Sequence, residues 1–367
     1  MSDRAPRLLF VPVSGAFGMG EYARALAIAQ GALARWPQAS IRFILSRAAP
    51  YAAASPFPAT LLDASPTFHS AAVIDTIEEF RPHAVIFDNA GRTAQLRAAC
   101  RCGARVVYVS ARRRQRRKAF RLRWMRLIDE HWIAYPQFIA GAPGWVERLK
   151  LKFLRRPVIR YLDVILARHR GLPPNSILTR LGVAAGGYVL VVPGGGTGHP
   201  GARDATQIFL AAARELAAAR IDTVFVGRAA GAAQGAGAAE PAAAPRQLRA
   251  TGSLPQPLLA DLMRGARLII ANGGSTLLQS IACGKACVAV PIAGDQDERI
   301  RRCVRAGVAV AAPLDAAKIR AIAAELMQNE PRLRTLGGRA SALGLADGID
   351  VAVDALSTLL DAPAAML

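Results

Sequence analysis

The chain has 367 residues, enough for two domains of ordinary size, and 52% of them are hydrophobic, although much of that share is alanine. It has no apolar run long enough to span a membrane and no signal-peptide pattern at its start, so we expect a cytoplasmic protein. The formal net charge of +21 predicts an anionic partner. The aromatic content of only 6% and the lack of a nucleic-acid-binding motif argue against nucleic acid as that partner.

In the first half of the chain, apolar runs of strand length alternate with longer stretches of helical character. We expect strands at residues 7–14, 41–45, 84–88 and 105–110, and a helix at residues 21–35. This alternation is typical of a parallel sheet with crossover helices. Residues 1–174 are therefore predicted to form a Rossmann-like domain.

The same alternation begins again after residue 185. Strands are expected at residues 188–193, 222–227, 267–271 and 286–291, with a helix at residues 204–219. The predicted fold class is α/β, with two Rossmann-like domains whose parallel sheets face across a cleft, and residues 175–346 form the second domain. Residues 347–367 are expected to include an amphipathic helix that packs back on the first domain.

The five cysteines do not form paired CxxC motifs at the spacing of a metal site. We therefore expect reduced thiols and no bound metal.

A glycine-rich turn follows the first predicted strand of each half. The first turn contains Gly18 and Gly20, with Arg24 in the helix that follows, and the second contains Gly195 and Thr197. Glycine lets the backbone approach a ligand, and the N-terminus of a helix carries a partial positive charge. Both turns are therefore candidates for binding an anionic or polar substrate.

The most specific pattern begins where the strand predicted at 267–271 ends. Two glycines free the backbone there, and two hydroxyl residues are placed to cap the next helix and to bond a diphosphate at its positive end. An aspartate and a glutamine follow on the loop after the next predicted strand, at the same edge of the sheet. The two loops therefore border one crevice. The residues are Gly273, Gly274, Ser275, Thr276, Asp295 and Gln296.

Residues 251–310 resemble the donor-binding region of GT-B glycosyltransferases, namely UDP-glycosyltransferases and the peptidoglycan GlcNAc transferases of the family 28 type. The resemblance is carried by Gly273, Gly274, Thr276, Gly284, Pro291, Asp295 and Gln296. It implies inverting, metal-independent transfer of a sugar from a nucleotide-diphosphate donor, in particular a UDP-sugar, to a hydroxyl of a lipid-linked or small hydrophobic acceptor. No cofactor is expected.

The resemblance also implies roles for individual residues. Gly274, Ser275 and Thr276 are expected at the diphosphate, and Asp295 and Gln296 at sugar hydroxyls. Residues near Ser253 and Leu254 are expected at the base. The family's ribose-binding glutamate is replaced by Gln279, which lacks the carboxylate charge, so the donor preference can differ.

The first glycine-rich turn resembles the family's Gly-x-Gly-His-x-x-Arg signature, with Glu21 in place of the histidine that often serves as base. A carboxylate can also take the proton of an acceptor hydroxyl. Asp88 is a second candidate base, and the alternative role of Glu21 is to complement the positive end of its helix.

Residues 112–126 contain nine basic residues among apolar ones. This mixture suits a helix on the anionic inner face of a membrane, with Arg113, Arg116 and Arg117 at lipid headgroups and Trp124 below them. A solvated helix with its apolar side in the core and a contact with an anionic acceptor are the alternatives.

Two other functions stay open at this point. One is a nucleotide-sugar hydrolase or 2-epimerase on the same scaffold. The other is a catalytically inactive nucleotide-binding homologue, which the replacements at Glu21 and Gln279 suggest.

Overall fold

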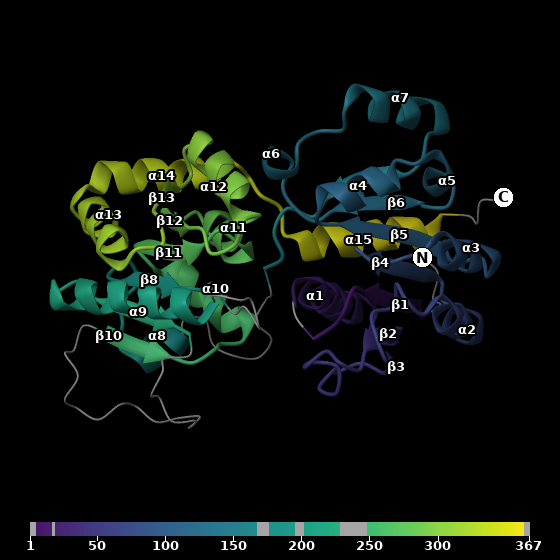
Figure 1. Cartoon of the computed structure of the whole chain (residues 1–367), viewed down its shortest axis with the longest axis horizontal. Coiled ribbons are helices and arrows are strands. Elements are labelled where there is room, and N and C mark those ends of the chain that lie inside the picture. The colour runs from purple at the N-terminus through teal and green to yellow at the C-terminus, as the bar shows by residue number, and fades with distance from the viewer. Residues whose placement is uncertain (1–4, 17–18, 167–175, 195–201, 228–247, 363–367) are drawn as a thin grey trace. The chain divides into compact units, whose positions relative to one another are not determined.

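The computed structural model describes residues 5–16, 19–166, 176–194, 202–227 and 248–362. The chain divides into two compact units (Figure 1). Unit 1 comprises Met1–Ile165 and Ala346–Leu367, and unit 2 comprises Leu166–Leu345. The chain therefore leaves unit 1, builds unit 2, and then re-enters unit 1.

Unit 1 contains a seven-stranded parallel sheet in the order β3-β2-β1-β4-β5-β6-β7. Its strands are β1 (Arg7–Pro12), β2 (Ser40–Ser46), β3 (Ala59–Leu62), β4 (Ala84–Asp88), β5 (Arg105–Ser110), β6 (Glu130–Ile133) and β7 (Val158–Tyr161). Its helices are α1 (Gly20–Arg35), α2 (Ser70–Phe80), α3 (Thr93–Arg101), α4 (Arg113–Ala119), α5 (Leu122–Met125), α6 (Gln137–Ala140), α7 (Trp145–Leu154) and α15 (Gly348–Asp361).

Unit 1 has a hydrophobic core on each face of its sheet. In β1, Leu8 and Phe10 belong to the core beneath α1 and α15, whereas Leu9 and Val11 belong to the core beneath α2 and α3. Successive side chains of a strand point to opposite faces, so a strand covered on both sides is apolar at every position. This explains the unbroken apolar run in the sequence.

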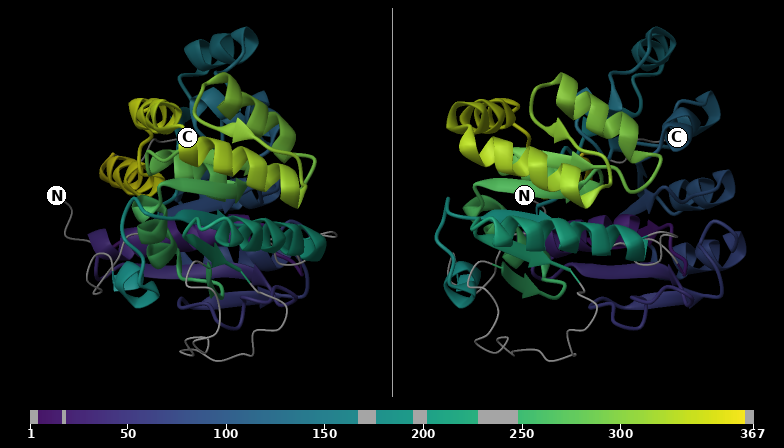
Figure 2. Two further views of the ribbon diagram at one scale, coloured as in Figure 1. Left: turned by 90° about the vertical axis from the view of Figure 1, so that its left-hand side faces the viewer. Right: turned by 60° about the vertical axis from the view of Figure 1, so that its left-hand side comes forward.

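Unit 2 contains a six-stranded parallel sheet in the order β10-β9-β8-β11-β12-β13, with helices on both sides (Figure 2). Its strands are β8 (Val189–Val192), β9 (Thr223–Val226), β10 (Leu248–Thr251), β11 (Leu268–Asn272), β12 (Cys287–Val290) and β13 (Val310–Ala311). Its helices are α8 (Ser176–Leu181), α9 (Ala202–Ala218), α10 (Gln256–Gly265), α11 (Ser275–Ala282), α12 (Gln296–Arg305), α13 (Ala316–Gln328) and α14 (Glu330–Ala342).

Both sheets have the strand order of doubly wound α/β folds. In unit 1 the order reverses between β1 and β4, and in unit 2 it reverses between β8 and β11. Crossover helices leave such a pair of strands on opposite faces, which opens a crevice at the carboxyl ends of the strands. The two glycine-rich turns that the sequence singles out follow β1 and β8, at these two positions.

The last helix, α15, belongs to unit 1 although it follows unit 2 in the chain. Its Ala352, Ala355 and Leu356 are buried in the core that α1 also covers. Gly31 of α1 lies directly against Ile349, where a Cβ atom would overlap the isoleucine side chain. The glycine thus allows close packing of the two helices.

The fold class predicted from the sequence is confirmed for each unit, because both are α/β with parallel sheets. All five cysteines are free thiols. Within the described ranges, none of the helices combines the length and the apolar character that crossing a membrane requires.

Candidate functional sites

In unit 1, Glu21 and Asp88 lie at the crevice between β1 and β4. Glu21 is the second residue of α1, and Asp88 is the last residue of β4. Gly20 begins α1 and is exposed, with open space around its Cα, whereas Gly18 lies outside the described residues. The crevice therefore collects polar side chains from segments far apart in the sequence.

Asp88 is held by Arg24 in a bidentate ion pair. Arg24 Nε and one terminal nitrogen each donate to a separate carboxylate oxygen across 2.8 Å. The Asp88 side chain is only 2% exposed and that of Arg24 only 10%. Burial raises the pKa of Asp88 to about 6, even though Arg24 opposes the shift. Arg24 bonds both carboxylate oxygens, so the ion pair fixes the position of the Arg24 guanidinium at the crevice.

Glu21 is held by Asn89, the residue after Asp88. Asn89 Nδ2 donates to Glu21 Oε1 across 2.8 Å, while Asn89 Oδ1 accepts from the backbone N–H of Ala111 across 2.9 Å. The backbone donor at Ala111 fixes which end of the amide is the acceptor, so the other end must donate to Glu21. Asn89 has φ of 52°, a left-handed conformation that asparagine tolerates. Glu21 is thus oriented by an amide in the way that a base is often oriented by a neighbour.

A pair of tyrosines lies near Glu21. Tyr22 and Tyr51 stack with their ring centroids 4.1 Å apart. Burial raises the pKa of Tyr51 to about 12, and the charge of Glu21 adds to this shift. The hydroxyl of Tyr51 therefore stays protonated around neutral pH.

In unit 2, Asn272 joins the turns that follow β8 and β11. Its Nδ2 donates to the carbonyl of Pro193 across 2.8 Å, and its Oδ1 accepts from the N–H of Gly274 across 2.9 Å. Gly194, with φ of 96°, passes so close to this amide that a Cβ atom would overlap it. Two of the predicted ligand residues, Gly195 and Thr197, lie outside the described residues.

Gln296 and Arg299 of α12 support the turn at Gly273. Gln296 Oε1 accepts from the N–H groups of Gly273 at 3.1 Å and of Ile292 at 3.0 Å. Arg299, which is buried, donates to the carbonyl of Gly273 and lies 3.4 Å from the exposed carboxylate of Asp295. A Cβ atom on Gly273 would overlap Ile300 and Gln296, so glycine is needed here for close packing as much as for backbone freedom.

The N-terminus of α11 differs from the expectation that Ser275 and Thr276 cap it. The N-cap residue is Gly274, which makes no side-chain cap hydrogen bond, and Ser275 and Thr276 are the first two helical residues. A glycine has no side chain with which to satisfy the first N–H groups. Ser275 is exposed and Thr276 is buried at 7% exposure. The helix end therefore offers backbone donors and a partial positive charge to a ligand.

The remaining predicted donor residues lie around α10 and α11. Gln279 is 8% exposed, and its Nε2 donates to Gln256 Oε1 across 3.1 Å. Ser253 is exposed and Leu254 is half-buried, both on the segment between β10 and α10. Gln279 thus faces the first residue of α10, which begins shortly after the segment expected at the base.

The expected lipid contact of Trp124 is wrong. Residues 112–126 form two short helices, α4 and α5, instead of one helix, and Trp124 is only 1% exposed. Its ring meets Tyr108 edge-on, and its Nε1 donates to Thr93 Oγ1 across 3.1 Å. The chain turns inward here because Ala119 and Trp124 belong to the core of unit 1, whereas Leu122 stays exposed.

Arg116 is also unsuited to the lipid contact that the sequence suggests. One of its terminal nitrogens donates to the carbonyls of Ala140 and Gly141, across 2.7 and 2.8 Å. Its side chain is 11% exposed and is therefore held within unit 1. Arg113 and Arg117 remain exposed.

Three site residues were not anticipated from the sequence, namely Asn89, Asn272 and Arg299. Asn89 and Asn272 stand where apolar strands end, a position at which polar side chains reach the crevice of a parallel sheet. That signal was available in the sequence. Arg299 carries no comparable signal, because its role depends on the fold of the turn above it.

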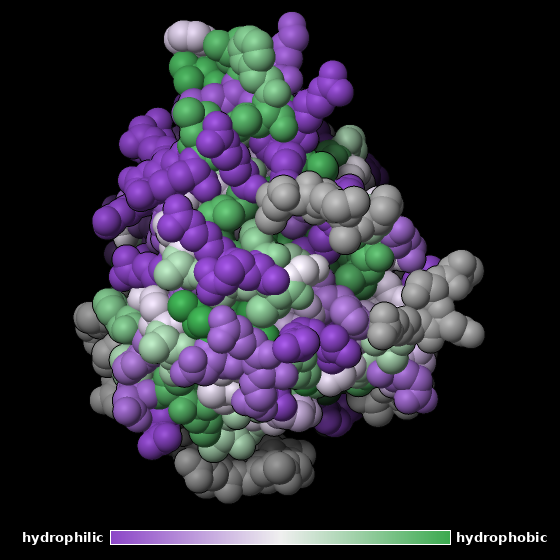
Figure 3. All heavy atoms as spheres, turned by 90° about the vertical axis from the view of Figure 1, so that its right-hand side faces the viewer, coloured by the Kyte–Doolittle hydropathy of each residue, from purple (hydrophilic) through white to green (hydrophobic). Residues whose placement is uncertain are grey.

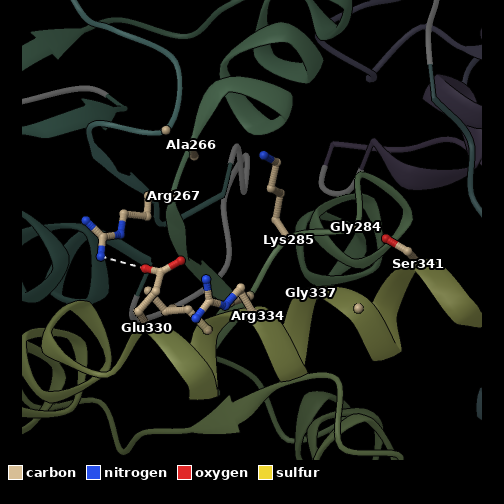
Figure 4. Close-up of a pocket in the computed structure, with 12 residues that line it drawn as sticks. Ala266, Arg267, Gly284, Lys285, Glu330, Arg334, Gly337 and Ser341 are labelled. Atoms are coloured by element: carbon tan, nitrogen blue, oxygen red, sulfur yellow. Dashed lines mark hydrogen bonds and ion pairs between the residues drawn. The ribbon is translucent and has the colours of Figure 1, made fainter.

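A pocket of about 620 Å³ lies at the opposite edge of the unit 2 sheet, where β11 and β12 begin (Figure 4). Arg267, Lys285, Glu330 and Arg334 line it, and Arg267 pairs with Glu330 across 2.7 Å. Burial lowers the pKa of Lys285. These cations complement the carboxyl-terminal ends of α10 and α11, where helix dipoles are negative. Because Asn272 is at the other end of β11, the pocket is separate from the crevice at Asn272.

Among the described residues, no three His, Cys, Asp or Glu side chains gather in a way that could hold a metal ion.

The sequence matches no protein-family model and no curated protein. Solved structures are similar to the chain over nearly all of its length. The spinosyn forosaminyltransferase SpnP is 14% identical, covers 98% of this chain and 100% of its own, and has a TM-score of 0.65. MurG of Acinetobacter baumannii is 16% identical, covers 97% of this chain and 100% of its own, and has a TM-score of 0.62. Arabidopsis thaliana UGT89C1 in complex with UDP is 15% identical, covers 97% of this chain and 99% of its own, and has a TM-score of 0.60. The fold of these proteins, GT-B, is the fold of this chain.

Proposed function

We propose, on the premise of the GT-B fold, that this protein is a glycosyltransferase that moves a sugar from a nucleotide-diphosphate donor to a hydroxyl of an acceptor. The observation that carries the proposal is the N-terminus of α11, where Gly274 leaves the first backbone donors without a side-chain cap. Such a helix end binds phosphate groups through its N–H groups and its partial charge. The similarity to UGT89C1 and LpCGTa, both solved with UDP, supports a UDP-sugar as donor.

In this proposal, groups of unit 2 stabilise the negative charge of the departing diphosphate. The α11 N-terminus supplies a partial positive charge, and the buried Arg299 lies beneath the same turn, bonded to the carbonyl of Gly273. Fixed dipoles and charges aimed at a developing negative charge stabilise the transition state. We infer that this arrangement takes the place of a divalent metal, and that transfer is metal-independent.

Asp295 and Gln279 are proposed to contact the donor sugar and ribose. The Asp295 carboxylate is 74% exposed and can accept from sugar hydroxyls, while Arg299 restrains it from one side. Gln279 offers an amide where related enzymes have a carboxylate. An amide still bonds a ribose hydroxyl, but with one acceptor oxygen and no charge.

Glu21 is the proposed base. As the acceptor oxygen attacks the anomeric carbon of the sugar, the bond from that carbon to the diphosphate oxygen breaks, and the hydroxyl proton passes to the Glu21 carboxylate. Attack opposite the leaving group inverts the anomeric centre. Asn89 holds Glu21 through a 2.8 Å hydrogen bond, and Asp88 is assigned to position Arg24. The acceptor class is proposed to be lipid-linked or small and hydrophobic, and UGT89C1, solved also with quercetin, supports the second.

The test is a ligand screen followed by a transfer assay. The chain is heated with UDP, with UDP-sugars and with sugars on other nucleotides, and a donor is identified by the rise in melting temperature that binding to the folded state produces. Nucleotide release is then measured with and without hydroxyl acceptors. Release that depends on an acceptor supports the proposal. Equal release without any acceptor would assign hydrolysis, and binding without release in a broad acceptor panel would assign an inactive nucleotide-binding protein.

A further inference from the structure

Helix α7 presents its largest apolar side chains to solvent. Trp145 is 73% exposed and Phe153 is 77% exposed, and Leu149, midway between them, is 47% exposed. With 3.6 residues per turn, these three side chains lie on one face of the helix. All ten residues of α7 are described, and none is buried. A surface helix normally turns its apolar face to the core, and α7 does the reverse.

Polar contacts fix α7 in this orientation. Glu147 accepts from the backbone N–H of Gly144 across 2.8 Å and lies 4.0 Å from Arg116. Lys150 Nζ donates to the carbonyl of Phe120 across 3.2 Å. Leu151 and Leu154, on the opposite face from Leu149, are half-buried. The apolar face therefore points outward as part of the folded unit 1.

Basic residues are frequent in α7 and in the stretch that is held next to it. Residues 145–156 contain five basic residues and one acid, Glu147, and residues 112–126 contain nine basic residues and no acid. The bonds from Arg116 to the carbonyls of Ala140 and Gly141 hold the second stretch next to the segment that leads into α7. Figure 3 shows hydrophobic side chains gathered at the tip of this face of the molecule with hydrophilic ones beside them.

We propose that α7 docks on an anionic lipid bilayer. Trp145, Leu149 and Phe153 enter the boundary between headgroups and acyl chains, and the basic residues around them meet lipid phosphates. An aromatic and aliphatic face bordered by lysine and arginine matches both layers of such a surface. The lipid contact expected at Trp124 is thereby assigned to a different tryptophan, Trp145.

The same charges argue against two other occupants. A second copy of the chain on this face would bring like charges together, which costs free energy. A nucleic acid would gain from the arginines and could stack bases on Trp145 and Phe153, but it would leave the aliphatic Val146 and Leu149 without an apolar partner. The bilayer accommodates both the cations and the aliphatic groups. This inference does not depend on the proposed enzymatic function.

Vesicle co-sedimentation of the full chain tests the proposal. We expect binding to phosphatidylcholine vesicles that contain phosphatidylglycerol, and at least tenfold weaker binding to phosphatidylcholine alone. The double variant Trp145→Ser/Phe153→Ser is expected to lose at least tenfold in affinity for the anionic vesicles, and Arg148→Gln/Lys152→Gln to lose a similar factor. Phe68→Ser is the matched control, because Phe68 is 73% exposed in unit 1 but lies outside α7, and it is expected to bind like the unaltered chain.

Tryptophan fluorescence gives a second readout. Trp124 and Trp132 are at most 1% exposed, whereas Trp145 is 73% exposed, so insertion is expected to shift the emission of Trp145 to shorter wavelength. Trp145→Phe should remove the shift but keep most of the sedimentation. Unchanged binding by the double variant, or no binding of the unaltered chain to anionic vesicles, overturns the proposal. A dimer that the double variant abolishes, without vesicle binding, would also overturn it and assign the face to a second copy.

Discussion

Asn89 Nδ2 lies 2.8 Å from Glu21 Oε1, although the two residues are 68 positions apart in the sequence. The carbonyl end of the same amide accepts from the backbone N–H of Ala111, so the direction of both bonds is determined. Glu21 is held at the carboxyl edge of the sheet, where ligands of doubly wound folds bind. The first two predictions test whether this carboxylate is the base.

Glu21→Gln is expected to lower kcat by about 10²–10⁴-fold, the usual contribution of a general base, with a much smaller change in the affinity for the donor. Glutamine keeps the size of the side chain and its bond to Asn89 after an amide rotation. The measurement is steady-state kinetics with the donor and acceptor identified in the screen. Glu79→Gln is the control, because Glu79 is an exposed carboxylate of α2 and should leave kcat unchanged. If Glu21→Gln retained more than half of kcat, a residue other than Glu21 would be the base.

Asn89→Asp is expected to move the acid limb of the kcat/KM profile to higher pH. The new carboxylate keeps an acceptor for the N–H of Ala111 but places a second negative charge against Glu21. Two carboxylates in contact ionise together only at higher pH. The profile is measured from pH 5 to 9, with Asn89→Gly as the matched variant, since glycine accepts the left-handed backbone of this position. Identical acid limbs in the unaltered chain and in Asn89→Asp would show that the residue at position 89 does not influence the catalytic base.

Arg24→Met is expected to destabilise unit 1 by about 3–5 kcal/mol, because it leaves the buried Asp88 carboxylate without a partner. The double variant Arg24→Met/Asp88→Asn should recover part of that loss, since the charge is removed together with its partner. Urea unfolding measures both. Arg101→Met is the control, because its ion pair with Glu78 is exposed and should contribute less than about 1 kcal/mol. A loss of less than about 1 kcal/mol in Arg24→Met would contradict a stabilising role for the buried ion pair.

His131 is expected to lower the stability of unit 1 as the pH falls below 6.5, and the raised pKa of Asp88 opposes this loss below about pH 6. The His131 side chain is fully buried, with Nε2 2.8 Å from Ser110 Oγ, and burial lowers its pKa to about 3 from the ordinary 6.5, with Arg116 adding to the shift. At His131 the folded state therefore binds fewer protons than the unfolded state between these pH values. The contribution is complete above pH 6.5 and is lost as the pH decreases, by at most about 1.4 kcal/mol per pH unit.

His131→Gln should remove the loss that comes from His131, because glutamine does not titrate, so the stability of this variant should fall less than that of the unaltered chain, or rise, as the pH decreases from 7 to 5. All four tryptophans, Trp36, Trp124, Trp132 and Trp145, belong to unit 1, so their fluorescence in urea follows the unfolding of that unit. Unfolding free energies at pH 7, 6 and 5 are compared between the two chains. Parallel lines for the two chains would show that another group sets the dependence.

Asp295→Ala is expected to lower kcat/KM by about 10²-fold or more while leaving the melting temperature unchanged, because the carboxylate is 74% exposed and its pairing with Arg299 is partly in solvent. Thr276→Ala should also abolish most of the turnover. Asp297→Ala, an exposed acid in the first turn of the same helix, is the matched control. Activity like that of the unaltered chain in both Asp295→Ala and Thr276→Ala would refute the donor-site assignment.

The sequence predicts the central strands well and the peripheral ones poorly. The strands predicted at 84–88 and 105–110 coincide with β4 and β5, because apolar residues fill both faces of a central strand. Strand β6 was not predicted, since it begins with Glu130 and His131. Both are buried, and partners distant in the sequence satisfy them: Arg160 for Glu130 and Ser110 for His131. A pattern of hydrophobicity does not contain those partners.

The candidate sites show the same division. The turns that hold Glu21 and Gly274 follow from glycines, strand ends and helix starts that are local in the sequence. The partners that complete them, Asn89 and Arg299, come from other elements and depend on the fold. Trp124 illustrates the reverse error, because a tryptophan among arginines matches both a lipid-facing helix and a core-facing one, and burial alone distinguishes them.

Helix α15 has a consequence for how the protein is made. A ribosome synthesises residues 1–165 of unit 1, then all of unit 2, and only then the helix that covers the core of unit 1 at Ala352, Ala355 and Leu356. Until then, the side of α1 around Gly31 and the apolar residues beneath α15 lack the helix that covers them in folded unit 1. The N-terminal half of the gene product is therefore the last to mature, and a premature stop after unit 2 would damage the unit that was translated first.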